Sequence, residues 1–482
     1  MRYLTLLRLF GLLLMFFSIS MLPPMAVAFF YHDAQWFVYL ESFSIIFVFG
    51  FSLWMIFRSY NEELKTRDGF LLVALLWTVL SFFGAIPFFM QLYPDVSFTD
   101  SLFETVSGLT TTGATIFDHL HTFPRALLYY RQQLNLLGGM GIIVLAVAIM
   151  PMLGIGGMQL YRAEATGPVK NTKLKPRIAE TAKILWMIYV GLVLLCIASY
   201  RAAGMPLFDA VGDAYSTVST GGFSLHTASF SFYHSNIINI IAIIFMLAGA
   251  INFGLHFYFL QQHRLSVYTK NPECVGFLKL VFFAFLITIG TLYWYQQPIT
   301  EETVINALFT VVSSITTCGL TVTNFSEWPA YLPFFIMIIA LIGGCAGSTS
   351  GGIKVVRYLL LKAQIKREIK HLIHPQAVYE NKLGDVTLPN PVVQSIWAFT
   401  SLFFSLVVII FLLLLATGLS VTTAFGAAIA CLTNLGASIG SVSNSFHSIS
   451  LLAKWILIVA MLAGRLEIFT ILVLFSREYW RY

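Results

Sequence analysis

Four short segments of the chain end at a glycine that follows small or polar residues. Aligned on that glycine, the four clusters read Thr111-Thr112-Gly113, Thr220-Gly221-Gly222, Thr317-Cys318-Gly319 and Asn434-Leu435-Gly436. Three positions before the glycine stand Thr110, Ser219, Thr316 and Thr433, and six positions before it stand Ser107, Ser216, Ser313 and the exception Ala430. Because several positions match in one register, the clusters are interpreted as copies of one repeated unit.

The chemistry that suits these clusters is coordination of a dehydrated cation by main-chain oxygens. Glycine has no Cβ, so its backbone can adopt dihedrals that turn successive carbonyls toward one axis. We expect each glycine and the carbonyls of the two residues before it to face that axis. The candidate ligands are Thr111, Thr112, Gly113, Thr220, Gly221, Gly222, Thr317, Cys318, Gly319, Asn434, Leu435 and Gly436. Close helix packing explains a single membrane glycine more simply, but it does not explain four in one register.

The segments that lead into the clusters are too short to cross a bilayer. They run from Asp100 to Thr112, Asp209 to Gly221, Asn306 to Cys318, and Thr423 to Leu435. A membrane crossing takes roughly 20 helical residues, so these segments are predicted to be re-entrant half-helices. We expect each to begin at its first residue, which is of a type that caps helices, and to point its partly negative C-terminal end at the cation.

The elements that position these half-helices lie in a membrane. The chain of 482 residues is 58% hydrophobic and only 10% charged, and its mean hydropathy is +0.82. A soluble protein of that composition is excluded, and the apolar runs predict ten membrane passes in an all-α integral membrane fold. The expected units are an N-terminal two-helix hairpin (1–68) and four pore repeats (69–178, 179–270, 271–385 and 386–482) around one pore.

The basic residues predict the orientation of the chain. With the N-terminus in the cytoplasm, 23 of the 28 Lys and Arg residues fall in internal connections or in the C-terminal tail. This bias places both termini in the cytoplasm, and it explains the net charge of +6 without a nucleic-acid partner. The first apolar run, Leu4 to Phe30, contains Ala26-Val27-Ala28 and so resembles a cleavable signal, but it is longer than a typical signal core and is expected to be retained.

Other reactive residues do not form sites. The five cysteines are odd in number and have no close pairs, so neither disulfides nor a zinc site are expected. His119 and His121, or His371 and His374, have no companion ligands at metal spacing. No nucleophile motif is present, so we expect neither an enzyme nor a bound cofactor.

A glycine-rich stretch interrupts the second spanning segment of the third repeat. Residues 343–352 include five glycines, which destabilise a helix by close to 1 kcal/mol each relative to alanine. A phosphate-binding loop is disfavoured because no Gly-Lys-Ser/Thr follows. We interpret the stretch as a plug below the filter, that is, below the predicted cation site formed by the four glycine clusters. Passive packing of glycines is the alternative. The candidate gate residues are Gly343, Gly344, Gly347, Ser348, Thr349, Ser350, Gly351 and Gly352.

Arg465 lies in an apolar run of the fourth repeat and is also a candidate gate residue. A charge at this depth usually faces the interior of the bundle, where it finds carbonyls or a carboxylate. Arg465 is therefore expected to hold the plug closed or to act as an electrostatic barrier. Pairing with Glu467 and snorkelling to the interface are the simpler alternatives.

With its four units of helix, half-helix, glycine and helix, the chain resembles the Trk/Ktr/HKT superfamily of potassium transporters. The extra hairpin and the glycine-rich break are similar to the bacterial TrkH/TrkG branch. The resemblance implies a potassium-preferring filter of four glycines, a gate at the broken helix beside Arg465, and a homodimer in the bacterial inner membrane. It also implies control by cytosolic TrkA-type nucleotide-binding (RCK) subunits. The departures are Asn434-Leu435 and Ala430 in the fourth repeat.

Two mechanisms of transport stay open, a gated channel-like conductor and a secondary transporter (symporter) that couples potassium to protons or sodium. Coupled carriers usually place ionisable residues at the midplane and pair broken helices in two halves. Four repeats with few midplane carboxylates favour the channel. A membrane enzyme or receptor scaffold is disfavoured, since neither a catalytic constellation nor a large soluble domain is present.

Overall fold

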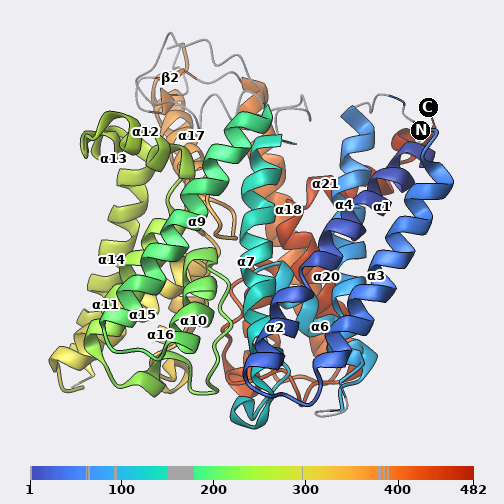
Figure 1. Cartoon of the computed structure of the whole chain (residues 1–482). Helices are drawn as coiled ribbons and strands as arrows, with labels where there is room; N and C mark the ends of the chain where they lie inside the picture. The colour runs from blue at the N-terminus through green and yellow to red at the C-terminus, as the bar shows by residue number, and fades with distance from the viewer. Residues whose placement is uncertain are drawn as a thin grey trace.

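The computed structural model describes residues 3–60, 62, 66–91, 95–148, 178–295, 297–329, 331–376, 382–383, 386–387 and 390–481. Figure 1 shows a bundle of long helices with shorter helices packed inside it. The N- and C-termini lie near one another at one end of the bundle, together with α12 (Phe253–Gln262), α13 (Ser266–Lys270) and α17 (Val355–Ile373). The described basic residues of α13 and α17 therefore lie at the same end as both termini, as the predicted orientation requires.

The N-terminal segment is an integral part of the fold. It comprises α1 (Tyr3–Ile19), α2 (Leu22–Phe30) and α3 (Trp36–Phe57). Gly11 of α1 and Gly50 of α3 let the two helices cross at close range: a Cβ on Gly11 would lie 2.6 Å from the Gly50 carbonyl oxygen. Gln133 Nε2 donates to Ser20 O at 2.7 Å, which ties the segment to the first repeat.

The same series of elements recurs four times after this hairpin. The first unit holds α4 (Thr66–Gly84), α5 (Ile86–Phe89), α6 (Phe98–Leu109), η1 (Leu120–Thr122) and α7 (Arg125–Ala148). The second holds α9 (Ile178–Ala202), α10 (Leu207–Ser219), η2 (Ser229–Tyr233), α11 (Asn236–Ala250), α12 and α13. The third holds α14 (Pro272–Trp294), α15 (Glu301–Ile315), η3 (Phe325–Glu327), α16 (Leu332–Ala340) and α17. The fourth holds α18 (Asn390–Ala416), α19 (Val421–Leu432), η4 (Gly440–Val442), α20 (Leu451–Arg465), α21 (Phe469–Phe475) and α22 (Arg477–Trp480).

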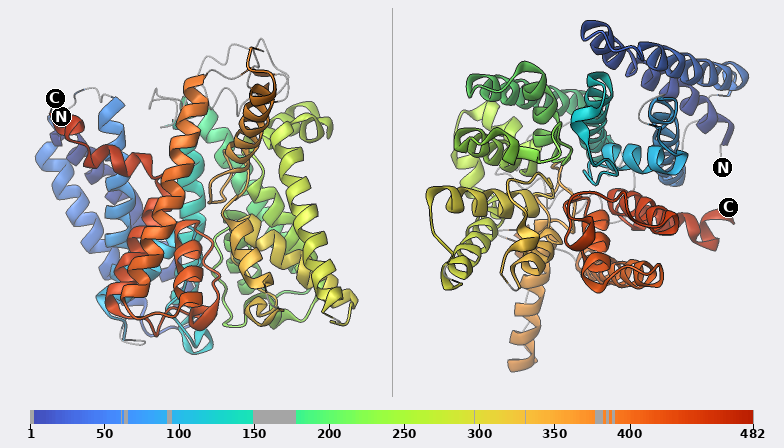
Figure 2. Two further views of the ribbon diagram at one scale, coloured as in Figure 1. Left: turned by 180° about the vertical axis from the view of Figure 1, so that it is seen from behind. Right: turned by 90° about the horizontal axis from the view of Figure 1, so that it is seen from below.

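The fold is all-α, as predicted, apart from one minimal strand pair. Strands β1 (Lys382–Leu383) and β2 (Val386–Thr387) pair antiparallel between α17 and α18. Seen along the bundle, the four units follow one another around a centre in chain order, and the N-terminal hairpin lies outside them (Figure 2).

Within the described residues, eight of the ten expected passes are long and apolar enough to cross a membrane, if two bent pairs each count as one pass. Six are single spans, and the bent pairs are α11 with α12, at 98°, and α20 with α21, at 109°. The other two expected passes correspond to α7, which leads into residues outside the described ranges, and to α16 and α17, which are separated by the glycine-rich stretch.

The half-helices are present, but their expected N-caps are wrong. The N-cap positions are instead occupied by Ser97, Pro206, Thr300 and Ser420, and each helix begins at the next residue. Asp100, Asp209 and Thr423 instead occupy the third helical position, where the Asp100 carboxylate accepts from Ser97 Oγ at 2.8 Å. Both residues of such a capping box are favourable at a helix start, so their types alone did not distinguish the cap from the third position.

Candidate functional site

All four half-helices end in the same backbone turn. The residue two before each glycine, namely Thr111, Thr220, Thr317 or Asn434, has a φ between 49° and 58°. The amide of the next residue donates at 2.8 Å to the carbonyl five residues back, as Thr112 N does to Ser107 O. This is the Schellman pattern, usually closed by glycine, so its formation at a non-glycine residue costs about 1–3 kcal/mol in each repeat.

The hydroxyl residues three before the glycine stabilise this turn. Thr110, Thr316 and Thr433 donate from Oγ1 to the carbonyl four residues back at 2.7–2.8 Å, and Ser219 donates to Ser216 O at 3.2 Å. The position six before the glycine contributes its carbonyl to the turn. Alanine therefore suffices there, and Leu435 N donates to Ala430 O at 2.8 Å like its counterparts.

The four glycines lie against one another's loops in a closed ring. A Cβ on Gly113 would lie 2.6 Å from Gly221 O, and a Cβ on Gly222 would lie 2.4 Å from Cys318 O. The ring continues in the other two repeats: a Cβ on Gly319 would lie 1.9 Å from Leu435 O, and a Cβ on Gly436 would lie 2.1 Å from Thr112 O. Each glycine therefore abuts the carbonyl before the next repeat's glycine, and no larger residue fits. The glycines also share a φ of 76° to 82°, which L-residues rarely adopt.

The predicted filter residues are thus brought together in one place. A cavity on one side of the ring is lined by Gly113, Gly222, Gly319 and Gly436, together with Arg131 and Phe223. The main-chain oxygens of Thr112, Gly221, Cys318 and Leu435 therefore lie in this ring, one from each repeat.

The glycine-rich stretch lies on the other side of the ring, among the ends of the half-helices. Gly351 N donates to Thr317 Oγ1 at 2.6 Å, and Gly352 N donates to Thr433 O at 3.1 Å. Thr349 Oγ1 donates to Val218 O at 3.2 Å and accepts from Thr220 Oγ1 at 3.2 Å. The stretch therefore contacts the filter segments of the second, third and fourth repeats directly.

The stretch is itself a folded structure. The chain that enters it and the chain that leaves it are joined by two main-chain hydrogen bonds. Ile353 N donates to Leu341 O at 2.9 Å, and Lys354 N donates to Ile342 O at 2.8 Å. Gly343, Gly347 and Gly352 have φ values from 67° to 76°, and Gly344 N donates to Ser350 Oγ at 2.7 Å. Ser348, Thr349 and Ser350 are buried, so the stretch fills the space below the ring.

Arg465 links this stretch to the first repeat. Its Nη2 donates to Thr111 Oγ1 at 2.6 Å and to Thr349 O at 3.0 Å, and the side chain is buried. Arg465 therefore contacts the glycine-rich stretch, as the gate hypothesis requires, while its role in gating stays a prediction. The alternative partner is wrong, because Glu467 accepts from Arg357 Nη2 at 2.7 Å instead. Through Arg465, the stretch reaches all four filter segments.

Sequence reasoning missed two further helix breaks. The second spanning segments of the second and fourth repeats bend near Ile251–Asn252 and Leu466–Ile468. The first bend contacts the glycine-rich stretch, because Cys345 N donates to Ala250 O at 2.9 Å and Phe253 N donates to Gly347 O at 3.0 Å. Asn252 caps α12 by accepting from Gly254 N at 2.7 Å, and an asparagine inside an apolar run was the available signal.

All five cysteines are free and buried. Among the described residues, no group of three or more His, Cys, Asp or Glu side chains is placed to hold a metal ion.

The fold and the ring together define a class: a multi-pass membrane protein whose four repeats place main-chain oxygens around a common centre. The TrkH family model, described as cation transport protein, matches residues 36–482. The chain belongs to this family, which is one of transport proteins and not of enzymes.

Curated relatives and solved structures are similar to this chain over its full length, as three examples show. The chain is 47% identical over 475 residues to the Trk system potassium uptake protein TrkH of Salmonella typhimurium, covering 98% of each. It is 39% identical over 471 residues to TrkG of Escherichia coli K12, covering 98% of this chain and 97% of that protein. The crystal structure of the potassium transporter TrkH from Vibrio parahaemolyticus matches with a TM-score of 0.93 and 44% identity over 100% of both chains.

Proposed function

We propose that this protein takes up potassium across the bacterial cytoplasmic membrane through a gated, channel-like pore. The single observation that carries the proposal is the closed ring in which each glycine abuts the carbonyl before the next glycine. Such a ring presents fixed main-chain oxygens to a dehydrated monovalent cation. The names of the relatives support potassium as that cation.

The selectivity filter of this proposal is the set of twelve residues around the four glycines. Main-chain oxygens of Thr111, Thr112, Gly113 and their counterparts in the other repeats bind the ion. The pore repeats are taken as 69–178, 179–270, 271–385 and 386–482, with 1–68 as the outer hairpin. Arg465 and residues 343–352 form the gate, because they occupy the space below the filter and contact every repeat.

The functional assembly of this proposal is a homodimer regulated by a cytosolic TrkA-type nucleotide-binding subunit. The "Trk system" in the names of the relatives supports a multi-component transporter. Both termini, α12, α13 and α17 face the cytoplasm in this arrangement. The described basic residues of α17 would then lie where such a subunit can dock.

Isotope uptake tests the proposal. The full chain is reconstituted into proteoliposomes, and rubidium-86 uptake is measured against increasing external potassium or sodium. Potassium is expected to compete at far lower concentration than sodium. Equal competition by both ions would contradict the selective filter, and uptake that requires a proton or sodium gradient would favour a coupled symporter.

A further inference from the structure

The half-helices carry different residues nine positions before the filter glycine. The first repeat has Glu104 there, the second Asp213, the third Thr310 and the fourth Ala427. All four positions lie inside a half-helix, and Glu104 and Asp213 are completely buried. Burying a carboxylate is unfavourable unless it is paired and hydrogen-bonded, so two such groups beside the filter need a physical explanation.

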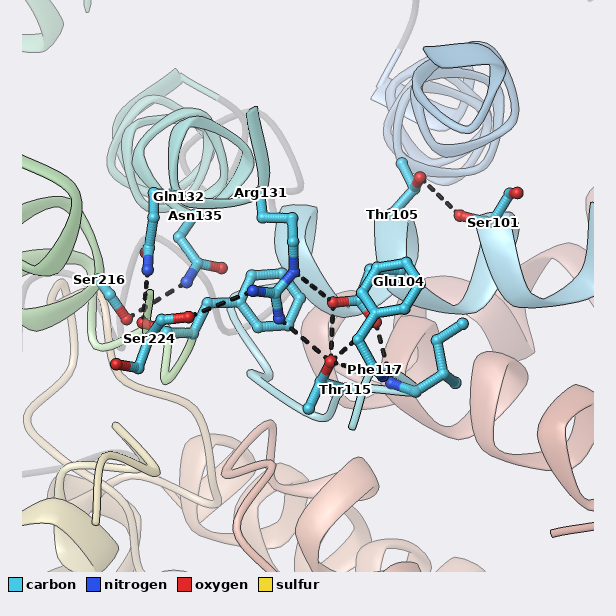
Figure 3. Close-up of polar contacts among 12 residues, drawn as sticks. Ser101, Glu104, Thr105, Thr115, Phe117, Arg131, Gln132, Asn135, Ser216 and Ser224 are labelled. Atoms are coloured by element: carbon cyan, nitrogen blue, oxygen red, sulfur yellow. Dashed lines mark hydrogen bonds and ion pairs between the residues drawn. The ribbon is translucent and has the colours of Figure 1, made fainter. Parts of the chain in front are cut away.

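Glu104 holds the chain that leaves the first filter segment (Figure 3). Its Oε2 accepts from the amide of Ile116 at 3.0 Å, and its Oε1 accepts from Thr115 Oγ1 at 3.0 Å. Ile116 lies three residues after Gly113. The carboxylate therefore fixes the main chain at the outer side of the filter, from behind the ring.

Arg131 of α7 completes this arrangement and extends it to the second repeat. Its Nε donates to Glu104 Oε1 at 2.7 Å, and its Nη1 donates to Ser224 O at 3.2 Å, two residues after Gly222. The guanidinium also lies 4.4 Å from the ring centroid of Phe223. One buried ion pair thus connects the outgoing chains of two adjacent repeats (Figure 3).

Asp213 repeats the geometry of Glu104 in the second repeat. Its Oδ1 accepts from the amide of Leu225 at 3.4 Å, and Leu225 lies three residues after Gly222, just as Ile116 lies three after Gly113. Its Oδ2 accepts from Tyr233 Oη at 2.6 Å. The two carboxylates make equivalent backbone contacts but have different second partners, an arginine in one repeat and a tyrosine in the other.

The third and fourth repeats have no carboxylate at this position. Thr310 Oγ1 donates to Asn306 O at 2.8 Å within its own helix, and Ala427 has no polar group. Their outgoing chains contact the first two repeats instead. Phe230 N of the second repeat donates to Thr321 O of the third at 2.9 Å, and Phe446 N of the fourth donates to Thr115 O of the first at 2.8 Å.

We propose that Glu104 and Asp213 are equivalent positioning residues that fix the selective geometry of the whole filter, two repeats directly and two through contacts with them. The inference rests on the proposed function, since it assigns both residues to the potassium filter. Neither carboxylate touches the ion. Each sets where the backbone runs three residues after a filter glycine, and so sets the size of the ring.

Side-chain removal tests this role, with rubidium-86 uptake by the full chain in proteoliposomes as the measurement. In Glu104→Ala and Asp213→Ala, the preference for potassium over sodium should fall about tenfold, the ratio that corresponds to one lost charge-assisted hydrogen bond. Thr310→Ala, the matched change in the third repeat, should leave the preference unchanged. Asp213→Asn keeps an oxygen that can accept from Leu225 N, so it should retain more of the preference than Asp213→Ala.

The possible outcomes separate this inference from the proposed function. A selective parent with equally selective, monodisperse alanine variants would overturn the positioning role alone. An equal loss in Thr310→Ala would also overturn it, because any cavity in a half-helix would then suffice. If the alanine variants aggregate, Asp213→Leu decides, because it keeps the volume of the side chain but removes the acceptor of Leu225 N; an unchanged preference in that variant overturns the inference. A parent without potassium preference would overturn the proposed function, and the inference with it.

Discussion

At the scale of single residues, the ring that we propose as the filter depends on the absence of a side chain at four positions. Each glycine combines a positive φ with a neighbouring carbonyl that occupies the place of a Cβ. Either constraint alone excludes most residues. The two constraints together explain why glycine recurs in every repeat. The residue before it differs between repeats, being Thr112, Gly221, Cys318 or Leu435, because this residue contributes its main-chain carbonyl to the ring.

Gly113→Ser should admit sodium, because the added Cβ must push the Gly221 carbonyl out of the ring. The preference for potassium over sodium in rubidium-86 competition should fall by about tenfold or more. Gly418→Ser is the matched control, since Gly418 has a φ of 90° and open space around its Cβ position. The filter assignment fails if Gly113→Ser keeps the selectivity of the parent.

Removal of one partner of the buried ion pair should destabilise the protein. Glu104 and Arg131 side chains are 0% and 1% exposed, so Arg131→Met leaves an uncompensated buried carboxylate. The expected loss is about 3–5 kcal/mol of unfolding free energy. The double variant Glu104→Gln/Arg131→Met should lose less than the sum of the single variants. Thermal unfolding in detergent measures this coupling, and strict additivity would contradict it.

At the scale of elements, a folded stretch of chain is held below the filter by hydrogen bonds to the ends of the half-helices. Arg465 contributes one contact to Thr111 and one to Thr349. The single proton of the Thr349 hydroxyl is shared between Val218 O at 3.2 Å and Gly249 O at 3.0 Å. In the proposed gate, these contacts stabilise the closed arrangement, and a conducting state would have to break them.

Thr349→Val should raise ion flux, since it removes the hydroxyl that donates to the buried Val218 carbonyl, whereas Gly249 O keeps the Thr349 amide as a donor. Loss of about 1–3 kcal/mol from the closed state corresponds to a shift of roughly fivefold to a hundredfold toward the open state. Arg465→Ala should act in the same direction. Thr400→Val is the control, because its hydroxyl bonds only Ile396 O within α18, at 2.9 Å. Reduced flux in monodisperse Thr349→Val protein would refute the gate.

The sequence predicts the half-helices and the glycine register because these signals are local and occur four times. It predicts the break at residues 343–352 because five glycines overwhelm helix propensity. The bend at Ile251–Asn252 escaped prediction, since its stabilising contacts come from Cys345 and Gly347, nearly a hundred residues later. The pairing of Glu104 with Arg131 escaped it for the same reason: neither residue belongs to a motif, and only the packed repeats bring them together.

At the scale of the whole molecule, the four units surround one centre in chain order (Figure 2). The end of the bundle that holds both termini also carries α17 (Figure 1). Lys362, Lys366 and Lys370 are exposed and follow one another at intervals of four residues, so they share one face of that helix. A positively charged face at this end suits a cytosolic partner with an acidic surface.

The regulatory partner should co-purify from native membranes at low salt and dissociate at high salt, where surface charges are screened. Replacing Lys362, Lys366 and Lys370 with glutamate should abolish co-purification, whereas arginine at all three should preserve it. Co-purification that survives the glutamate substitutions would place the docking surface elsewhere.

The purified protein should also have a mass of about twice 53.9 kDa, as determined by native mass spectrometry after release from detergent. A single chain that is fully active in uptake assays would contradict the homodimer. Each protomer holds a complete ring, so the dimer is expected to support regulation and not to form the pore.

The most direct test of a selective ring of main-chain oxygens is current through the protein in a planar bilayer. Potassium is placed on one side and sodium on the other, and the reversal potential of single-channel current is measured. A channel-like pore with this filter predicts unitary currents that reverse far toward the potassium equilibrium potential. Reversal near zero, or rubidium-86 uptake without any unitary current from the same preparation, would contradict it.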